Sequence, residues 1–234
     1  MPDDASAGLA LLFLHALPLD GRMWSAQADL LPHATYAPTL YALGDSLTEW
    51  AAAALAQVRE NRIVVVGNSV GGSCALEVAR LAPDRVEALV LIGTNARHRP
   101  NPELHARALG ILAEGGVEAG WQAFWHALFA GGNDAARSTG RRLALGCTAE
   151  DIARGVTVFH TRPDLEATLG AFEGPVVYVT GAEDIAPGPE SSARQAGLAR
   201  NGRLVVIEGC GHYVPLERPA ELNAILAEVI GGLR

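Results

Sequence analysis

Short runs of apolar residues recur along the chain, each four to six residues long and without polar alternation. Such runs, rich in Val, Ile and Leu, are typical of strands that are covered on both faces of a parallel sheet. We expect strands at residues 9–14, 63–66, 88–92, 176–180 and 204–207. A weaker strand pattern at residues 35–40 contains Pro38, which cannot donate a hydrogen bond to a neighbouring strand.

Helical patterns separate these runs. Residues 47–58 are alanine-rich with apolar positions at helical spacing, and residues 70–81 form a second pattern that stops before Pro83. Pro219 suits the first turn of a last helix, whose apolar positions continue to Ile230. Strands that alternate with helices predict an α/β fold with a doubly wound, mostly parallel sheet.

One long segment interrupts this alternation. Residues 95–174 contain no good strand pattern, only helical patterns separated by Gly, Asn and Pro. The segment is far longer than the loops of compact domains. We therefore expect residues 1–94 and 175–234 to form the core, with residues 95–174 inserted between two strands as a helical cap.

Composition narrows the class of protein. Of 234 residues, 49% are hydrophobic and 19% are charged, as in one globular domain with an insertion. The absence of lysine excludes a lysine Schiff base and a Walker-type phosphate loop. The net charge of −8 argues against nucleic acid or an anionic membrane as a partner.

Apolar stretches and cysteine spacing bear on cellular location and metal binding. No apolar stretch reaches the ~18 residues of a membrane span, and the run at 9–14 makes a poor signal peptide. Cys74, Cys147 and Cys210 are widely spaced and form neither a disulfide framework nor a metal-binding pattern. We expect a cytoplasmic protein without a metal or a cofactor.

The sequence Gly-Asn-Ser-Val-Gly at residues 67–71 has the pattern of a nucleophilic serine turn. By composition alone the pattern is weak, but it directly follows an expected strand and directly precedes an expected helix. A sharp turn there would expose the Ser69 hydroxyl at the start of the helix, whose dipole favours a developing anion. The alternative is a glycine-rich phosphate-binding turn.

A serine nucleophile needs a base and an orienting acid. His212 follows the expected strand at 204–207, and Asp184 follows the one at 176–180. Loops after parallel strands share one edge of the sheet, so both side chains can reach Ser69. Glu183 is adjacent and could replace Asp184. The order Ser69, Asp184, His212 differs from the chymotrypsin and subtilisin orders.

The oxyanion of a tetrahedral intermediate needs N–H donors. Val70 offers one at the start of its helix, and the loop after residues 9–14 offers a second at Leu17. Pro18 has no N–H to donate. His15 would then hold this loop in place, although an ordinary strand-to-helix turn is the alternative.

These motifs together resemble those of the α/β-hydrolase superfamily over nearly the whole chain. Residues 67–72 look like its nucleophile elbow, residues 15–20 like its oxyanion loop, and residues 181–184 and 209–219 like its acid and histidine segments. The extension of the oxyanion loop to Trp24, the stretch 162–165 and the position of the cap are similar to the branch with 3-oxoadipate enol-lactonases and small esterases. Two departures are Ala16 in place of the usual glycine and a short N-terminus that leaves the usual N-terminal hairpin reduced or absent.

The expected substrate pocket is apolar. Five aromatic and aliphatic residues are spaced so that they lie on one face of a helix. This face either packs the cap on the core or lines an acyl pocket. The residues are Trp121, Phe124, Trp125, Leu128 and Phe129. Trp24 and Tyr213 flank catalytic positions and are further wall residues. Nothing in the sequence selects one of the cap arginines as a clamp for a substrate carboxylate.

The main hypothesis is a serine hydrolase that cleaves a small ester, lactone or thioester through an acyl-enzyme. Ser69, Asp184 and His212 would be catalytic, and Leu17 and Val70 would form the oxyanion hole. The alternative is a C–C bond hydrolase, lyase or cyclase that uses the same residues to move protons. A non-catalytic ligand receptor is a third reading. The partner is a small molecule, and the chain is a monomer or a homodimer.

Overall fold

The computed structural model describes residues 8–233 and is built on one parallel sheet. Six strands follow the order β2-β1-β3-β4-β5-β6, and every neighbouring pair is parallel. They are β1 (Leu9–Leu14), β2 (Thr35–Tyr36), β3 (Arg62–Asn68), β4 (Val86–Ile92), β5 (Pro175–Gly181) and β6 (Asn201–Ile207). The predicted α/β class is confirmed. The prediction about an N-terminal hairpin concerns residues that lie mostly outside the described part of the chain.

The strands differ in how completely they are covered. Every residue of β1 is buried, as are most residues of β3, β4 and β5. The prediction of two-sided cover is wrong for β6, in which Val206 is 41% exposed. Its apolar run resembles the others, but β6 pairs only with β5 and forms one edge of the sheet.

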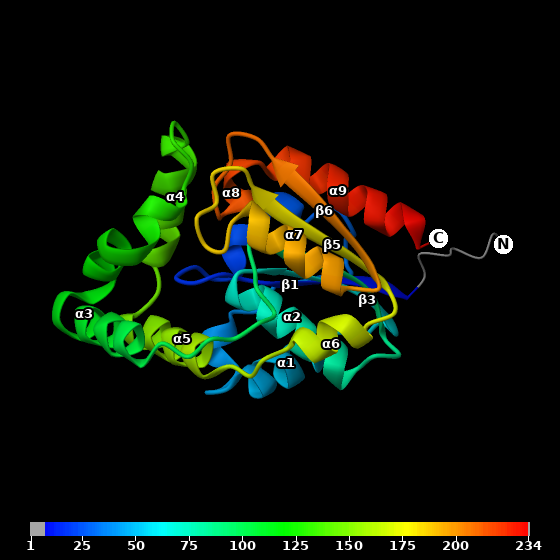
Figure 1. The fold of residues 1–234 in the computed structure, drawn as a ribbon, viewed down its shortest axis with the longest axis horizontal. Coiled ribbons are helices and arrows are strands. Elements are labelled where there is room, and N and C mark those ends of the chain that lie inside the picture. The colour runs from blue at the N-terminus through cyan, green and yellow to red at the C-terminus, as the bar shows by residue number, and fades with distance from the viewer. Residues whose placement is uncertain (1–7, 234) are drawn as a thin grey trace.

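Helices cover both faces of the sheet (Figure 1). One row runs from α1 (Leu47–Leu55) through α2 (Val70–Leu81) and α6 (Glu166–Ala171) to α7 (Pro189–Leu198), each packed on the next. The 3-10 helix η1 (Gly21–Gln27) contacts both α8 (Val214–Glu217) and α9 (Pro219–Gly232). A short 3-10 turn, η2 (Leu40–Ala42), follows β2.

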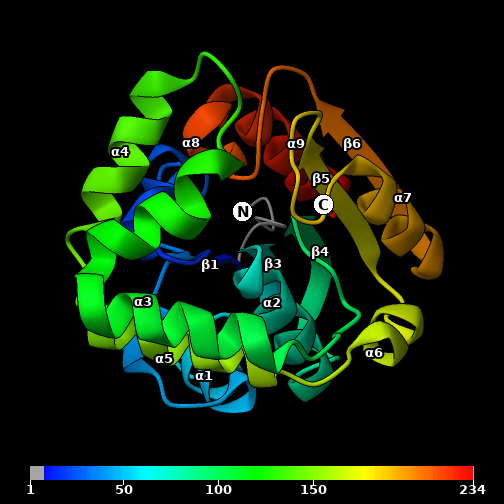
Figure 2. The same cartoon turned by 60° about the vertical axis from the view of Figure 1, so that its left-hand side comes forward.

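All regular secondary structure between β4 and β5 is helical. Its elements are α3 (Pro102–Gly120), η3 (Trp121–Trp125), η4 (His126–Leu128), α4 (Asp134–Ala144), α5 (Ala149–Thr161) and α6. Figure 2 shows α3, α4 and α5 gathered to one side of the sheet, with α3 running along α5. The last helix, α6, lies apart from them and packs against α2 and α7.

The expected aromatic stripe is not one regular helix. Gly116 has a φ of 66° and kinks α3, and the chain then forms a π-helical turn, η3, followed by the 3-10 turn η4. The changes in helical pitch direct neighbouring aromatic residues to different places. Trp121 is fully buried, whereas Phe124 is only partly covered.

Candidate active site

Ser69 stands at the turn between β3 and α2, with φ 57° and ψ −120°. A residue with a side chain adopts such a conformation only when its surroundings enforce it. Here the Ser69 N–H donates to the Ile92 carbonyl at 2.8 Å, and the Thr94 hydroxyl donates to the Ser69 carbonyl at 2.7 Å. The main chain at Ser69 is therefore anchored from β4 and from the loop that follows it.

Two glycines make room for this turn. A Cβ atom on Gly67 would lie 2.2 Å from the carbonyl oxygen of Gly71, and one on Gly71 would lie 2.1 Å from that of Leu14. Both distances are far inside van der Waals contact, so neither position accepts a larger residue without movement of the main chain. The Gly-x-Ser-x-Gly spacing is thus a steric requirement of the way α2 packs on β1 and β3.

His212 and Asp184 form a buried hydrogen-bonded pair. The Nδ1 atom of His212 lies 3.1 Å and 3.2 Å from the two carboxylate oxygens of Asp184. Burial by itself raises the pKa of Asp184, but His212 and the N–H of Ala186 outweigh it and lower that pKa below its usual value. With its Nδ1 proton directed at the carboxylate, the imidazole leaves Nε2 free to accept a proton.

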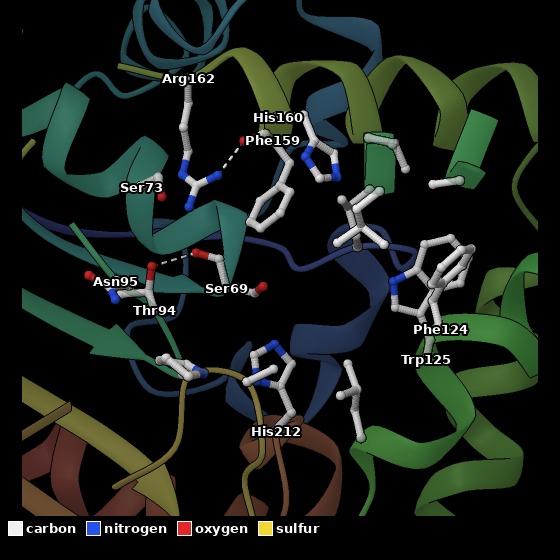
Figure 3. Close-up of a pocket in the computed structure, with 18 residues that line it drawn as sticks. Ser69, Ser73, Thr94, Asn95, Phe124, Trp125, Phe159, His160, Arg162 and His212 are labelled. Carbon is white, nitrogen blue, oxygen red and sulfur yellow. Dashed lines mark hydrogen bonds between the residues drawn. The ribbon is translucent and has the colours of Figure 1, made fainter. Parts of the chain in front are cut away.

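Glu183, the alternative acid, points elsewhere. Its Oε2 atom accepts the N–H of Gly131 at 2.9 Å, in the loop before α4. The structure therefore brings Asp184, and not Glu183, to His212. Figure 3 shows the ring of His212 facing the side chain of Ser69 across one cavity, which both residues line.

The buried carboxylate of Glu217, which the sequence did not single out, holds the loop that carries His212 by hydrogen bonds. Glu217 is 6% exposed and accepts four hydrogen bonds. The donors are the N–H groups of Ala130 (2.9 Å), Gly211 (3.1 Å) and Tyr213 (3.2 Å) and the side-chain amide of Asn133 (2.8 Å). In addition, the His212 N–H donates to the Leu128 carbonyl at 2.8 Å. The histidine loop is thereby tied to the segment 128–133.

The two backbone N–H groups predicted to hold the oxyanion belong to Val70 and Leu17. Val70 is the first residue of α2, so its N–H has no acceptor within its own helix. The N–H of Leu17 has no acceptor among residues 8–233, while its carbonyl accepts the Tyr213 hydroxyl at 2.8 Å. Both predicted oxyanion donors are therefore unoccupied within the described chain.

His15 holds the loop from inside. Its Nε2 atom accepts the N–H of Leu40 at 2.8 Å, and Nδ1 lies 3.1 Å from the Ala16 carbonyl. Burial lowers the pKa of His15 to about 4, so the ring is neutral at pH 7. A neutral ring with its proton on Nδ1 satisfies both contacts.

The cavity beside Ser69 has a volume of about 390 Å³. Its walls come mainly from apolar side chains of the loop after β1, the helical segment and the loop after β5: Leu17, Leu104, Ala108, Phe124, Trp125, Leu128, Val156, Phe159, Ala186 and Pro187. Ser69 and His212 also line it, with Thr94 beside Ser69 (Figure 3). Such a space suits a small, largely apolar molecule.

The predicted wall residues divide into two groups. Trp125 lines the cavity, together with Phe124 and Leu128 of the same stripe. Trp24 and Trp121 do not line it: Trp24 stacks on Phe13 at 4.9 Å, and Trp121 packs against Phe129.

Tyr213 is also buried outside the cavity, where it stacks on Phe129 at 4.6 Å and supports the carbonyl of Leu17. These corrections for Trp24, Trp121 and Tyr213 share one cause. Large aromatic residues near a site fill the packed interior as readily as a cavity wall, and sequence spacing does not distinguish the two positions.

The cavity contains polar residues that the sequence did not single out. Arg162 and His160 reach it from the end of α5, and Asn95 and Ser73 lie nearby (Figure 3). The only sequence signal for Arg162 was its place at the start of the stretch 162–165. Among residues 8–233, no group of three His, Cys, Asp or Glu side chains could hold a metal ion, and no helix is long and apolar enough to cross a membrane.

Known proteins resemble this chain in sequence and in fold. The sequence model of the alpha/beta hydrolase family matches residues 11–225. A pimeloyl-[acyl-carrier protein] methyl ester esterase of Aromatoleum aromaticum is 28% identical over 95% of this chain and 98% of its own length.

Solved structures show the same fold. A thermophilic esterase from Thermogutta terrifontis, determined with malate bound, has a TM-score of 0.88 and 25% identity, covering 97% of this chain and 90% of its own. The enol-lactonase from Burkholderia xenovorans has a TM-score of 0.82 and 18% identity, with 95% and 91% covered.

Proposed function

Because the chain belongs to the alpha/beta hydrolase family, we propose that it is a serine hydrolase that cleaves a small ester, lactone or thioester through an acyl-enzyme. The observation that carries this proposal is the buried His212–Asp184 pair beside the strained turn at Ser69. Esterases among its relatives favour a carboxylic ester as the substrate.

The proposed reaction begins with proton transfer. Nε2 of His212 takes the proton of the Ser69 hydroxyl as its oxygen attacks the carbonyl carbon. Asp184 keeps the imidazole in the required tautomer and stabilises the imidazolium that forms. The N–H groups of Leu17 and Val70 hold the oxyanion. His212 then gives its proton to the leaving group, and the acyl group stays on Ser69.

The second half returns the enzyme to its starting state. Nε2 of His212 takes a proton from a water molecule, which attacks the acyl carbon and forms a second tetrahedral intermediate. Collapse of this intermediate breaks the bond to Ser69, and His212 returns its proton to the serine oxygen. The acid product then leaves.

We also propose that residues 95–174 act as a cap on a core formed by residues 1–94 and 175–234. Phe124, Trp125 and Leu128 are among its side chains that line the cavity, so the cap sets the shape of the acyl pocket. Its last helix, α6, rests on the core. Three free cysteines fit a reducing, cytoplasmic location, which we include in the proposal.

The experiment pairs Ser69→Ala with Ser73→Ala as a matched control, since Ser73 lies one helical turn away and lines the same cavity. We expect Ser69→Ala to lower turnover of p-nitrophenyl acetate on the order of 10⁶-fold and to abolish labelling by a fluorophosphonate. Ser73→Ala should keep its labelling. Turnover in Ser69→Ala above a tenth of the starting rate would overturn the proposal. An enzyme that uses these residues only to move protons would form no acyl-enzyme with the ester.

A further inference from the structure

The guanidinium of Arg162 is buried in the wall of the apolar cavity. Arg162 follows the last residue of α5 and is only 9% exposed. Its guanidinium lies over the ring of Phe159, 4.0 Å from the centroid, and donates to the Phe159 carbonyl. Figure 3 shows the guanidinium directed into the cavity, toward Ser73. Its Nε atom has no hydrogen-bond partner within residues 8–233.

No carboxylate of the described chain neutralises Arg162. Asp164 is two residues away, but its oxygens accept the N–H groups of Glu166 at 3.0 Å and His98 at 3.2 Å. Burial lowers the pKa of Arg162 to about 10, and Asp164 offsets this only in part. The guanidinium therefore stays charged at neutral pH in an apolar wall, an arrangement that is costly unless an anion joins it.

Other arginines of the helical segment are placed differently. Arg137, Arg141 and Arg154 each form ion pairs with carboxylates near the surface, whose partners include Asp134, Glu118 and Asp45. Arg162 is thus set apart by three properties at once, namely its burial, its place in the cavity wall and the absence of an ion pair among residues 8–233.

Neighbouring polar groups could complete an anion site. His160 lines the cavity beside Arg162, and its ring stacks on His105 at 4.9 Å. Burial and the nearby charge of His105 and Arg162 lower the pKa of His160 to about 4, which leaves a neutral imidazole at pH 7. The Ser73 hydroxyl and the Asn95 amide also line the cavity. Each of these groups can donate a hydrogen bond to an oxyanion.

We propose that Arg162 binds a free carboxylate of the substrate, so that the enzyme acts on small esters or lactones that also carry a carboxylate group. The proposal rests on the serine hydrolase function above. A planar guanidinium matches a carboxylate through two parallel hydrogen bonds, and the unpartnered Nε–H is one of its donors. The apolar walls between Arg162 and the Ser69–His212 side would hold the carbon chain that joins the two groups.

The test uses pairs of esters in which one member carries a carboxylate and the other does not. In one pair, the p-nitrophenyl monoester of adipic acid is compared with p-nitrophenyl hexanoate, which places the carboxylate on the acyl chain. In the other, 4-acetoxybenzoate is compared with phenyl acetate, which places it on the leaving group. The measured quantity is the ratio of kcat/KM for the charged ester to that for its neutral partner.

We expect Arg162→Met, which keeps an apolar stem on Phe159, to lower this ratio about 100-fold in at least one pair. Arg162→Lys should lower the ratio less, because lysine keeps the positive charge but cannot form two parallel hydrogen bonds to a carboxylate. Arg107→Met is the control, because Arg107 lies over Phe124 at 5.8 Å but on the surface. It should leave both ratios unchanged.

An unchanged ratio in Arg162→Met for both pairs would overturn the assignment. If that unchanged ratio comes with an equal loss of kcat/KM for charged and neutral esters, Arg162 has a purely structural role on Phe159. Fluorophosphonate labelling of Ser69 in the same proteins separates this failure from that of the proposed function. Normal labelling and neutral-ester turnover in the wild type, with no charge effect, would remove only the carboxylate site.

Discussion

Replacing Glu217 with glutamine tests whether its carboxylate holds the histidine loop in place. The best-placed amide keeps its oxygen at the Oε2 position and its three donors, which are Ala130, Gly211 and Asn133. Its NH₂ group then faces the Tyr213 N–H, where the Oε1 atom was. That donor loses its acceptor in a site closed to water.

The expected cost follows from these contacts. Three hydrogen bonds change from charge-assisted to neutral, at about 1 kcal/mol each, and one buried donor is left unsatisfied at roughly 1–3 kcal/mol. Burying a neutral amide in place of a charge offsets part of this loss. We expect a net destabilisation of about 3 kcal/mol, which for a chain of this size lowers Tm by roughly 6–12 °C.

The assay is thermal unfolding with ester turnover measured well below both transitions. Glu221→Gln is the matched control, since Glu221 is half exposed and its nearest cation, Arg218, lies 4.0 Å away. We expect kcat to fall at least tenfold in Glu217→Gln, because small displacements of a catalytic base are costly, and to stay unchanged in the control. A Tm within 2 °C of that control would refute the role assigned to this carboxylate.

Two other predictions concern His212 and His15. Asp184→Asn should lower kcat about 10⁴-fold by favouring the wrong His212 tautomer, whereas Glu183→Gln should have a far smaller effect; equal losses in steady-state assays would contradict the assignment. Because the pKa of His15 is lowered to about 4 in the folded protein, the unfolded chain binds this proton first. Stability from His15 is therefore complete above about pH 6.5 and falls by about 3 kcal/mol as the pH drops to 4. Between pH 7 and pH 5, the free energy of urea unfolding should change by about 2 kcal/mol less in His15→Gln than in the wild type, and an equal change in both proteins would count against this prediction.

Strands were predictable from the sequence where an apolar run coincides with a buried position inside the sheet. The apolar runs of β1, β3, β4 and β5 reflect helices on both faces of the sheet, and each was expected close to its observed bounds. The run in β6 has the same composition, yet it lies at the edge. Strand order depends on contacts between distant segments, so the pattern alone could not show that β6 is half exposed.

Part of the candidate site was predictable, because the glycines around Ser69 and the order of strands along the chain fix where its side chains lie. The turn at Ser69 is encoded within five residues, and Asp184 and His212 follow adjacent strands of the sheet. The residues of the cavity wall could not be predicted, because the same aromatic residues occur both in a packed core and in a cavity wall. Nor could spacing separate Arg162 from the surface arginines, since its burial arises from its packing on Phe159 of α5 and its place in the cavity wall.

The positive φ of Ser69 bears on how this enzyme can lose its activity during evolution. Holding a non-glycine residue there costs on the order of 1–3 kcal/mol, and glycine would relieve this at a smaller cost of roughly 0.5–1 kcal/mol in chain entropy. We therefore expect the fold to tolerate Ser69→Gly, the mutation that would remove the proposed nucleophile. A lineage released from selection for turnover would then be expected to drift toward a more stable protein with glycine at this position.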